Sequence, residues 1–156
     1  MNTLDSRDLE ERLSELEELE QTLEDAQNEL DEFLRDNPEP ELDKEDDSEY
    51  VKWLDEKDEL ESKISSAESD FSDTEREELY DLRALCEEVG GEWKYGVQFI
   101  PESDFTDYCK ELCEEIGAIP SDFPDYIVIN WEETADNIRQ DYSECTINGE
   151  SYLYRA

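Results

Sequence analysis

The sequence predicts an α+β protein: an N-terminal acidic, antiparallel helical hairpin of coiled-coil type, followed by a small α+β domain that ends in a β-hairpin. All five glycines and most of the aromatic residues fall after residue 80. Apolar positions there change from helical spacing to alternation in places, whereas the first part keeps a helical period throughout. We therefore expect two domains, residues 1–71 and residues 72–156.

The hairpin is predicted by two apolar seams. A leucine recurs every seventh residue at Leu9, Leu16, Leu23 and Leu30. This repeat is typical of a helix with one narrow apolar stripe, here over residues 9–36. Pro38 and Pro40 end that helix, and a second seam runs from Trp53 to Phe71. Neither helix can bury its stripe alone, and the sequence leaves open whether the seams pair within one chain or between two, as a homodimer.

Capping and turn residues mark the elements of the second part. Ser72 or Asp73 can cap a helix over residues 74–89, which Gly90 and Gly91 can end. A strand over residues 92–100 is then expected, followed by a helix with Ser103 as its N-cap and Gly117 just after its end. Asn130 is the expected cap of a further helix.

A terminal β-hairpin is predicted at the very end of this domain. Asn148-Gly149 is the strongest two-residue turn signal, and apolar residues alternate on both sides of it. The whole second part is a unit of about 80 residues, near the small end of what folds alone.

The charge of the chain is extreme. Fifty acidic residues face thirteen basic ones, so the formal net charge is -37. Residues 1–80 carry -24 of it and residues 81–156 carry -13. Such a surplus repels nucleic acid and anionic membranes and attracts basic surfaces. With a polar N-terminus and no long apolar run, we expect a cytoplasmic protein without a membrane partner.

Residue types that commonly act in catalysis or bind metal ions are scarce in this sequence. The chain has no histidine, and so it lacks the commonest general base and metal ligand. Cys109 and Cys113 share a helix face, but without histidine or a CxxC pair we expect them in the core as free thiols. The acidic run 43–56 offers oxygen ligands but lacks the glycine of a calcium loop. We therefore expect no catalytic activity, no cofactor and no resident metal.

The acids of the predicted helices are spaced along the helix axis much as phosphates are spaced along an equal length of B-DNA. Residues 9–36 span about 42 Å as a helix, over which B-DNA carries about 25 phosphates. Carboxylates three or four positions apart lie about 5–6 Å from each other, near the spacing of neighbouring phosphates. Only Arg7, Arg12 and Arg35 are basic before residue 37. We interpret the acids as an imitation of DNA that suits the basic groove of a DNA-binding host enzyme, with no direct binding to nucleic acid.

The candidate contact residues are the acids that lie off the two seams. They are Glu10, Glu11, Glu15, Glu17, Glu18, Glu20, Glu24, Asp25, Glu29, Asp31, Glu32, Asp46, Asp47, Glu49, Asp55, Glu56, Asp58 and Glu59. Each one alone is indistinguishable from a solvated surface charge, so the hypothesis concerns the set. The aromatic residues Trp93, Trp131, Tyr126, Tyr152 and Tyr154 are expected in the core instead.

Two other interpretations remain open. An acidic coiled-coil adaptor would use its seam to bind another helix, and the acids would only keep it in solution. A protein adapted to a high-salt cytoplasm would also be acidic. That adaptation should acidify the whole surface evenly, however, and here the first half carries nearly twice the charge of the second.

The C-terminal part resembles a known family. Its "INWEETADNIRQDY" stretch and the terminal "YLYR" are similar to the end of phage- and plasmid-borne antirestriction proteins of the ArdA type. The matching residues, within residues 99–155, are Ile129, Trp131, Glu132, Ala135, Ile138, Arg139, Asp141, Tyr142, Tyr152, Tyr154 and Arg155. The resemblance implies an acidic, dimeric DNA mimic that evades host defence by occupying the DNA groove of type I restriction–modification enzymes. The family's elongated three-domain body differs from the hairpin expected for residues 1–71, so a CRISPR effector or a DNA glycosylase is an alternative target.

Overall fold

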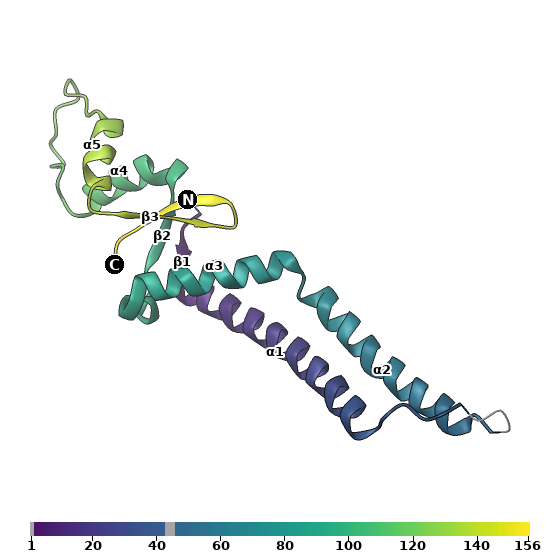
Figure 1. Cartoon of the computed structure of the whole chain (residues 1–156). Helices are drawn as coiled ribbons and strands as arrows, with labels where there is room; N and C mark the ends of the chain where they lie inside the picture. Colours follow the sequence, from purple (N-terminus) through teal and green to yellow (C-terminus); the bar gives the residue numbers. More distant parts are fainter. Residues whose placement is uncertain (1, 43–45) are drawn as a thin grey trace. The chain divides into compact units, whose positions relative to one another are not determined.

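The computed structural model describes residues 2–42 and 46–156. Within these ranges the chain forms five α-helices and a four-stranded antiparallel sheet, which confirms the predicted α+β class (Figure 1). It divides into two compact units. We call Leu13–Leu79 the helical unit, and Met1–Arg12 with Tyr80–Ala156 the sheet unit.

This division differs from the predicted domains because the first residues belong with the sheet. Strand β1 (Leu4–Asp5) pairs antiparallel with β2 (Gln98–Pro101). The buried Ser6 follows β1, and its hydroxyl donates to the carbonyl of Trp93 at 2.6 Å and accepts the N–H of Val97 at 2.7 Å. A two-residue strand has too few positions for an alternating pattern, so the sequence did not indicate it.

The helical unit contains most of α1 (Ser6–Asp36), all of α2 (Ser48–Asp70) and the start of α3 (Asp73–Val89). Helices α1 and α2 lie side by side within the chain (Figure 1). The rings of Phe33 and Trp53 stack with centroids 6.3 Å apart, and Lys63 Nζ lies 3.2 Å from Glu29 Oε1. Pairing of the seams between two chains stays a prediction.

Burial along this pair of helices is uneven. Leu16 is fully buried and Leu23 is 4% exposed, and Phe71 near the end of α2 is buried as well. Towards the loop that joins α1 to α2, Phe33 and Trp53 are only half-buried. The apolar seam is therefore closed at one end of the unit and partly open at the other.

In the sheet unit the strand order is β1-β2-β4-β3, with β3 at Ser143–Ile147 and β4 at Glu150–Tyr154. The predicted terminal hairpin is confirmed. Asn148 and Gly149 have φ angles of 51° and 82°, the left-handed pair that a tight hairpin turn requires.

Two helices cover one face of this sheet. They are α4 (Phe105–Glu115) and α5 (Trp131–Arg139). Ile100 and Leu153 of the sheet form a core cluster with Phe105, Cys109 and Ala135 of the helices.

Three local predictions in the sheet unit were wrong. Gly90–Tyr95 form a 3-10 helix and the strand begins only at Gln98, because the chain turns at Gly96 with φ 94°. Ser103 does not cap a helix, since a 3-10 turn over Glu102–Asp104 precedes α4. Tyr126, expected in the core, is 84% exposed.

Candidate functional site

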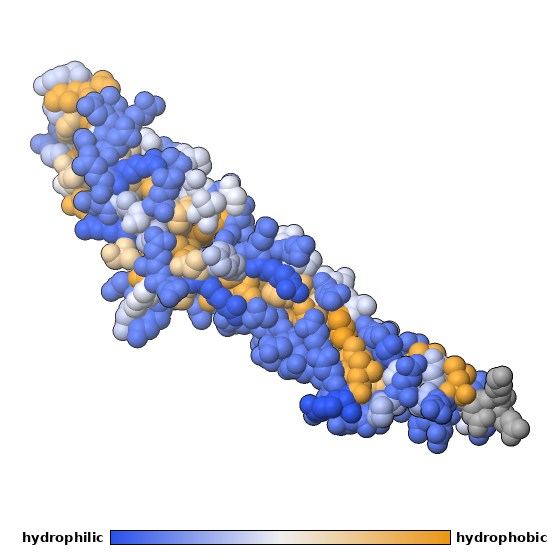
Figure 2. Space-filling view, in the orientation of Figure 1, coloured by the Kyte–Doolittle hydropathy of each residue, from blue (hydrophilic) through white to orange (hydrophobic). Residues whose placement is uncertain are grey.

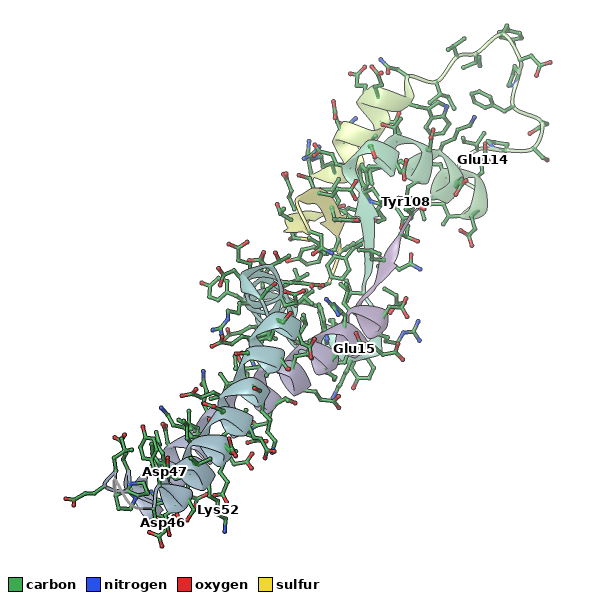
Figure 3. The ribbon with its side chains drawn as sticks, turned by 90° about the vertical axis from the view of Figure 1, so that its right-hand side faces the viewer. Glu15, Asp46, Asp47, Lys52, Tyr108 and Glu114 are labelled. Atoms are coloured by element: carbon green, nitrogen blue, oxygen red, sulfur yellow. The ribbon has the colours of Figure 1, made fainter. Side chains whose placement is uncertain are left out.

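The acids that the sequence singles out lie on the surface. All of them are exposed except Glu20, which is half-buried. Glu10 and Glu11 belong to the sheet unit, and the other members of the set belong to the helical unit. Figure 3 shows side chains that point outward around α1 and α2, with Asp46, Asp47 and Lys52 at the start of α2.

Two of these acids have a structural role. The Glu10 carboxylate accepts a hydrogen bond of 2.6 Å from Nε1 of the buried Trp93. Asp46 accepts the backbone N–H of Ser48 at 3.1 Å, at the start of α2, and hydrogen bonds from Ser48 lower the pKa of this carboxyl. These two carboxylates stabilise local structure, which the sequence did not indicate.

Others are compensated inside the helical unit. Glu29 pairs with Lys63 across the two helices, and Glu32 lies 3.6 Å from Arg35. Lys57 lies 3.5 Å from Glu61 and 5.6 Å from the centre of the Trp53 ring. Several cations of the unit are thus already engaged within the chain.

A third group of acids has no ion pair or side-chain hydrogen bond with any residue that the structure describes. Its members are Glu11, Glu18, Glu24, Asp31, Asp47, Glu49, Asp55, Glu56, Asp58 and Glu59. We call them the uncompensated acids. Asp55, Asp58 and Glu59 stand three and four positions apart, so they share one side of α2. On that side of α2 the acids outnumber the basic residues, Lys52 and Lys63.

Sequence reasoning missed a smaller acidic surface in the sheet unit. Asp107, Glu111 and Glu114 line a hollow of about 390 Å³ on α4, together with Asp104 and Lys110. Their spacing along one helix side was legible in the sequence. On the apolar side of the same helix Cys109 is fully buried and Tyr108 is half-buried.

The buried reactive groups of the sheet unit are held in their neutral forms. Burial, with a smaller effect of Cys113, raises the pKa of the Cys109 thiol to about 11. Burial and the Tyr108 hydroxyl, 3.5 Å away, also raise the pKa of Tyr142. All four cysteines are free thiols. These groups are suited to packing rather than to nucleophilic attack near neutral pH.

The described part of the chain bears on two other kinds of site, a metal centre and a membrane span. No group of three or more His, Cys, Asp or Glu there could hold a metal ion. No described helix has the length and apolar character needed to cross a membrane. Residues 43–45 of the acidic run considered for calcium lie outside the described residues.

Comparison with known proteins found no matching family model, no matching curated protein and no matching solved structure. The uncompensated acids and their geometry are therefore the basis for assigning a function.

Proposed function

We propose that this protein is a DNA mimic that inhibits a DNA-handling enzyme of host defence by occupying its basic DNA-binding groove. Type I restriction–modification enzymes are the first proposed target, on the resemblance of residues 99–155 to antirestriction proteins. A CRISPR effector or a DNA glycosylase is the alternative. The proposal involves no catalytic step. The protein would be encoded by a phage or another mobile element and would act in the cytoplasm of the bacterial host.

The observation that carries the proposal is the set of uncompensated acids in the helical unit. Like charges at three or four positions cost a helix about 0.2–0.5 kcal/mol per pair. Of the three lysines of α2, Lys57 and Lys63 pair with other acids, so Lys52, three positions before Asp55, is left to reduce that cost. A surface of this kind is stabilised most by a partner that brings its own cations.

The dimensions of α2 suit a DNA-binding groove. Its 23 residues extend over about 33 Å, a length on which B-DNA carries about 20 phosphates. Binding of a basic groove would release counterions from both surfaces, so the affinity should fall steeply with salt, as it does for DNA.

The test is a competition experiment with a purified type I restriction–modification enzyme and a fluorescent duplex that contains its site. The wild-type protein should displace the duplex at about 0.1 M salt and lose this ability at about 0.5 M. Neutralising Asp55, Glu56, Asp58 and Glu59 to their amides should weaken displacement at least tenfold. A failure to displace DNA from this enzyme, a CRISPR effector and a glycosylase alike would contradict the proposal.

The matched control neutralises a similar number of acids in the sheet unit, at Asp107, Glu111, Glu114 and Glu115. It changes the net charge by the same amount. If this control weakens displacement as much as the α2 variant does, the effect comes from total charge and not from the helical unit.

A coiled-coil adaptor is the second candidate, because two apolar residues at the open end of the helical unit are exposed. Leu34 is 38% exposed and Val51 is 45% exposed. An adaptor would lose its partner when these two residues become lysine, and it would tolerate loss of the α2 acids. The DNA mimic should respond in the opposite way.

A further inference from the structure

Three hollows follow one side of the α1–α2 pair in the helical unit. The first, of about 600 Å³, lies between Thr22 of α1 and residues 55–70 of α2. The second, of about 320 Å³, shares Glu59 and Lys63 with the first. The third, of about 390 Å³, shares Glu56 with the second and extends to the start of α2. Because neighbouring hollows share residues, we treat them as one groove.

The spacing of the lining residues supports a single groove. On α1 the lining positions are 22, 29, 33 and 36, and on α2 they include a row at 49, 53, 56, 60, 63, 67 and 70, with further lining positions beside it. Residues with this spacing lie in one row along a helix. Each helix therefore contributes one wall, and the groove runs for about 32 Å.

The groove has an apolar floor and acidic rims. Phe33, Trp53 and Leu60 are half-buried in it, and Ala67 is buried at its far end. The rims carry the uncompensated acids of α2 from Glu49 to Glu59, which outnumber the two lysines of the lining, Lys52 and Lys63. Figure 2 shows a stripe of apolar surface flanked by hydrophilic surface on the arm that α1 and α2 form.

The charges of the rim restrict what can lie in this groove. A second copy of the chain also carries a net charge of -37, so it would repel the rim. DNA and anionic lipids are repelled for the same reason. A basic protein segment is attracted, and an apolar floor adds affinity only if that segment also has an apolar side.

We propose that the groove seats one basic, amphipathic α-helix of the partner protein. About 20 residues of helix match the length of the groove. The apolar side of such a helix would cover Phe33, Trp53 and Leu60, and its lysines and arginines would meet the acids of the rim. DNA-binding proteins commonly carry basic helices that enter the major groove. The inference rests on the proposed function and adds that an apolar contact, not charge alone, selects the partner.

The first experiment uses two synthetic peptides of about 20 residues with identical composition. One places leucines on one side of a helix and arginines on its flanks, and the other has the same residues scrambled. Fluorescence anisotropy with the full-length protein at about 0.15 M salt should give at least tenfold tighter binding of the amphipathic peptide. Equal binding of the two peptides would overturn the groove, because charge alone would then account for affinity.

Matched variants locate the binding. Ser66 lines the first hollow, whereas the adjacent Ser65 is exposed on α2 outside all three hollows. Ser66→Arg fills the groove, so the amphipathic peptide should bind at least tenfold more weakly. Ser65→Arg adds the same charge and should change binding less than about twofold. If Ser66→Arg disturbs the circular dichroism spectrum, Ser62→Arg in the same hollow replaces it.

Equal effects of the Ser66→Arg and Ser65→Arg variants would also overturn the groove. This result is distinguishable from failure of the proposed function. A protein that still displaces DNA from a defence enzyme, with both variants equally active, would be a DNA mimic without a helix-binding groove. A protein that binds the amphipathic peptide but displaces no DNA would have the groove and a different function.

Discussion

The sheet unit and the helical unit both have acidic surfaces, but they differ in how completely their apolar residues are buried. In the sheet unit Phe99, Ile100, Cys109 and Leu153 are at most 1% exposed, so the core is closed on both faces of the sheet. In the helical unit Leu16, Phe71 and Leu79 are at most 2% exposed. Towards the loop between α1 and α2 the seam is half-buried and acids surround it.

The difference indicates where the free energy of folding comes from. Apolar burial stabilises by roughly 25 cal/mol per Å², and like charges on a helix cost a few tenths of a kcal/mol per pair. A closed core therefore tolerates many surface acids. An open two-helix seam buries less apolar surface, so it has less stabilising free energy to offset the same repulsion. We expect the open end of the helical unit, which carries the proposed groove, to be the least stable part of the described chain.

The largest expected effect tests this contrast directly. Phe99→Ala removes a fully buried ring that contacts Trp93 and Tyr154, with centroid distances of 6.1 Å and 5.2 Å. We expect a loss of about 3–5 kcal/mol in the free energy of unfolding. Leu60→Ala in the half-buried seam should cost only about 1–2 kcal/mol. Urea denaturation followed by circular dichroism measures both, and equal losses would contradict the comparison.

A second pair of variants separates acids by their role. Glu10→Ala removes the acceptor of the Trp93 indole N–H and leaves a buried donor without its partner. We expect a loss of about 1.5–3 kcal/mol. The adjacent Glu11 has no partner among the described residues, so Glu11→Ala should change stability by less than about 0.5 kcal/mol. Thermal unfolding of the two variants under one set of conditions is the measurement.

Elements defined by local chemistry could be predicted from the sequence. Ser72 precedes α3, and its N–H donates to the carboxylate of Glu75 at 3.1 Å, as in a capping box. Asn130 accepts the N–H of Glu133 at 3.2 Å at the start of α5. The turn between β3 and β4 likewise follows from the two adjacent residues Asn148 and Gly149. In each case the residues that form the contact are at most three positions apart.

Features that depend on distant contacts could not be predicted. Ser6 bonds to residues 87 and 91 positions away, and these contacts bring the N-terminus to the sheet. The partner of Glu10 is 83 positions away, so a structural acid was assigned to the contact set. For the candidate site, the seams predicted which acids are exposed. The ion pair between Glu29 of α1 and Lys63 of α2 could not be predicted, because it depends on how the two helices pack against each other.

In the helical unit, removing negative charge should stabilise the protein. Amide substitutions at Asp55, Glu56, Asp58 and Glu59 eliminate like-charge pairs at three and four positions along α2. We expect a gain of up to about 1 kcal/mol at about 0.02 M salt, and almost none at about 0.5 M, where screening is strong. The control Glu29→Gln loses its pair with Lys63 and should give no gain. A loss of stability in the fourfold variant at low salt would contradict the assignment of these acids as uncompensated.

In the sheet unit, removing the negative charge of Asp5 should destabilise the protein instead. Asp5 accepts hydrogen bonds from Arg7 N, Nε and Nη2 at 2.9, 3.0 and 2.8 Å, and these bonds lower the pKa of its carboxyl from 3.8 to about 2. The folded state then binds fewer protons than the unfolded state between these values. The stabilisation is complete above about pH 4 and is lost as the pH falls through about 2.

Asp5→Asn tests this last and smallest effect. The Arg7 side chain of this pair is 67% exposed and the Asp5 side chain is 22% exposed, so screening by water at the guanidinium keeps the contribution of the pair small. The difference in unfolding free energy between wild type and variant should be constant from pH 7 to about 4 and then shrink towards pH 2. In an Arg7→Ala background the pH-dependent effect should be smaller but still present, because the backbone N–H of residue 7 continues to donate to the Asp5 carboxylate. If Asp5→Asn instead stabilises the protein at neutral pH, then repulsion outweighs local pairing in the sheet unit as well, and the two units differ only in their apolar cores.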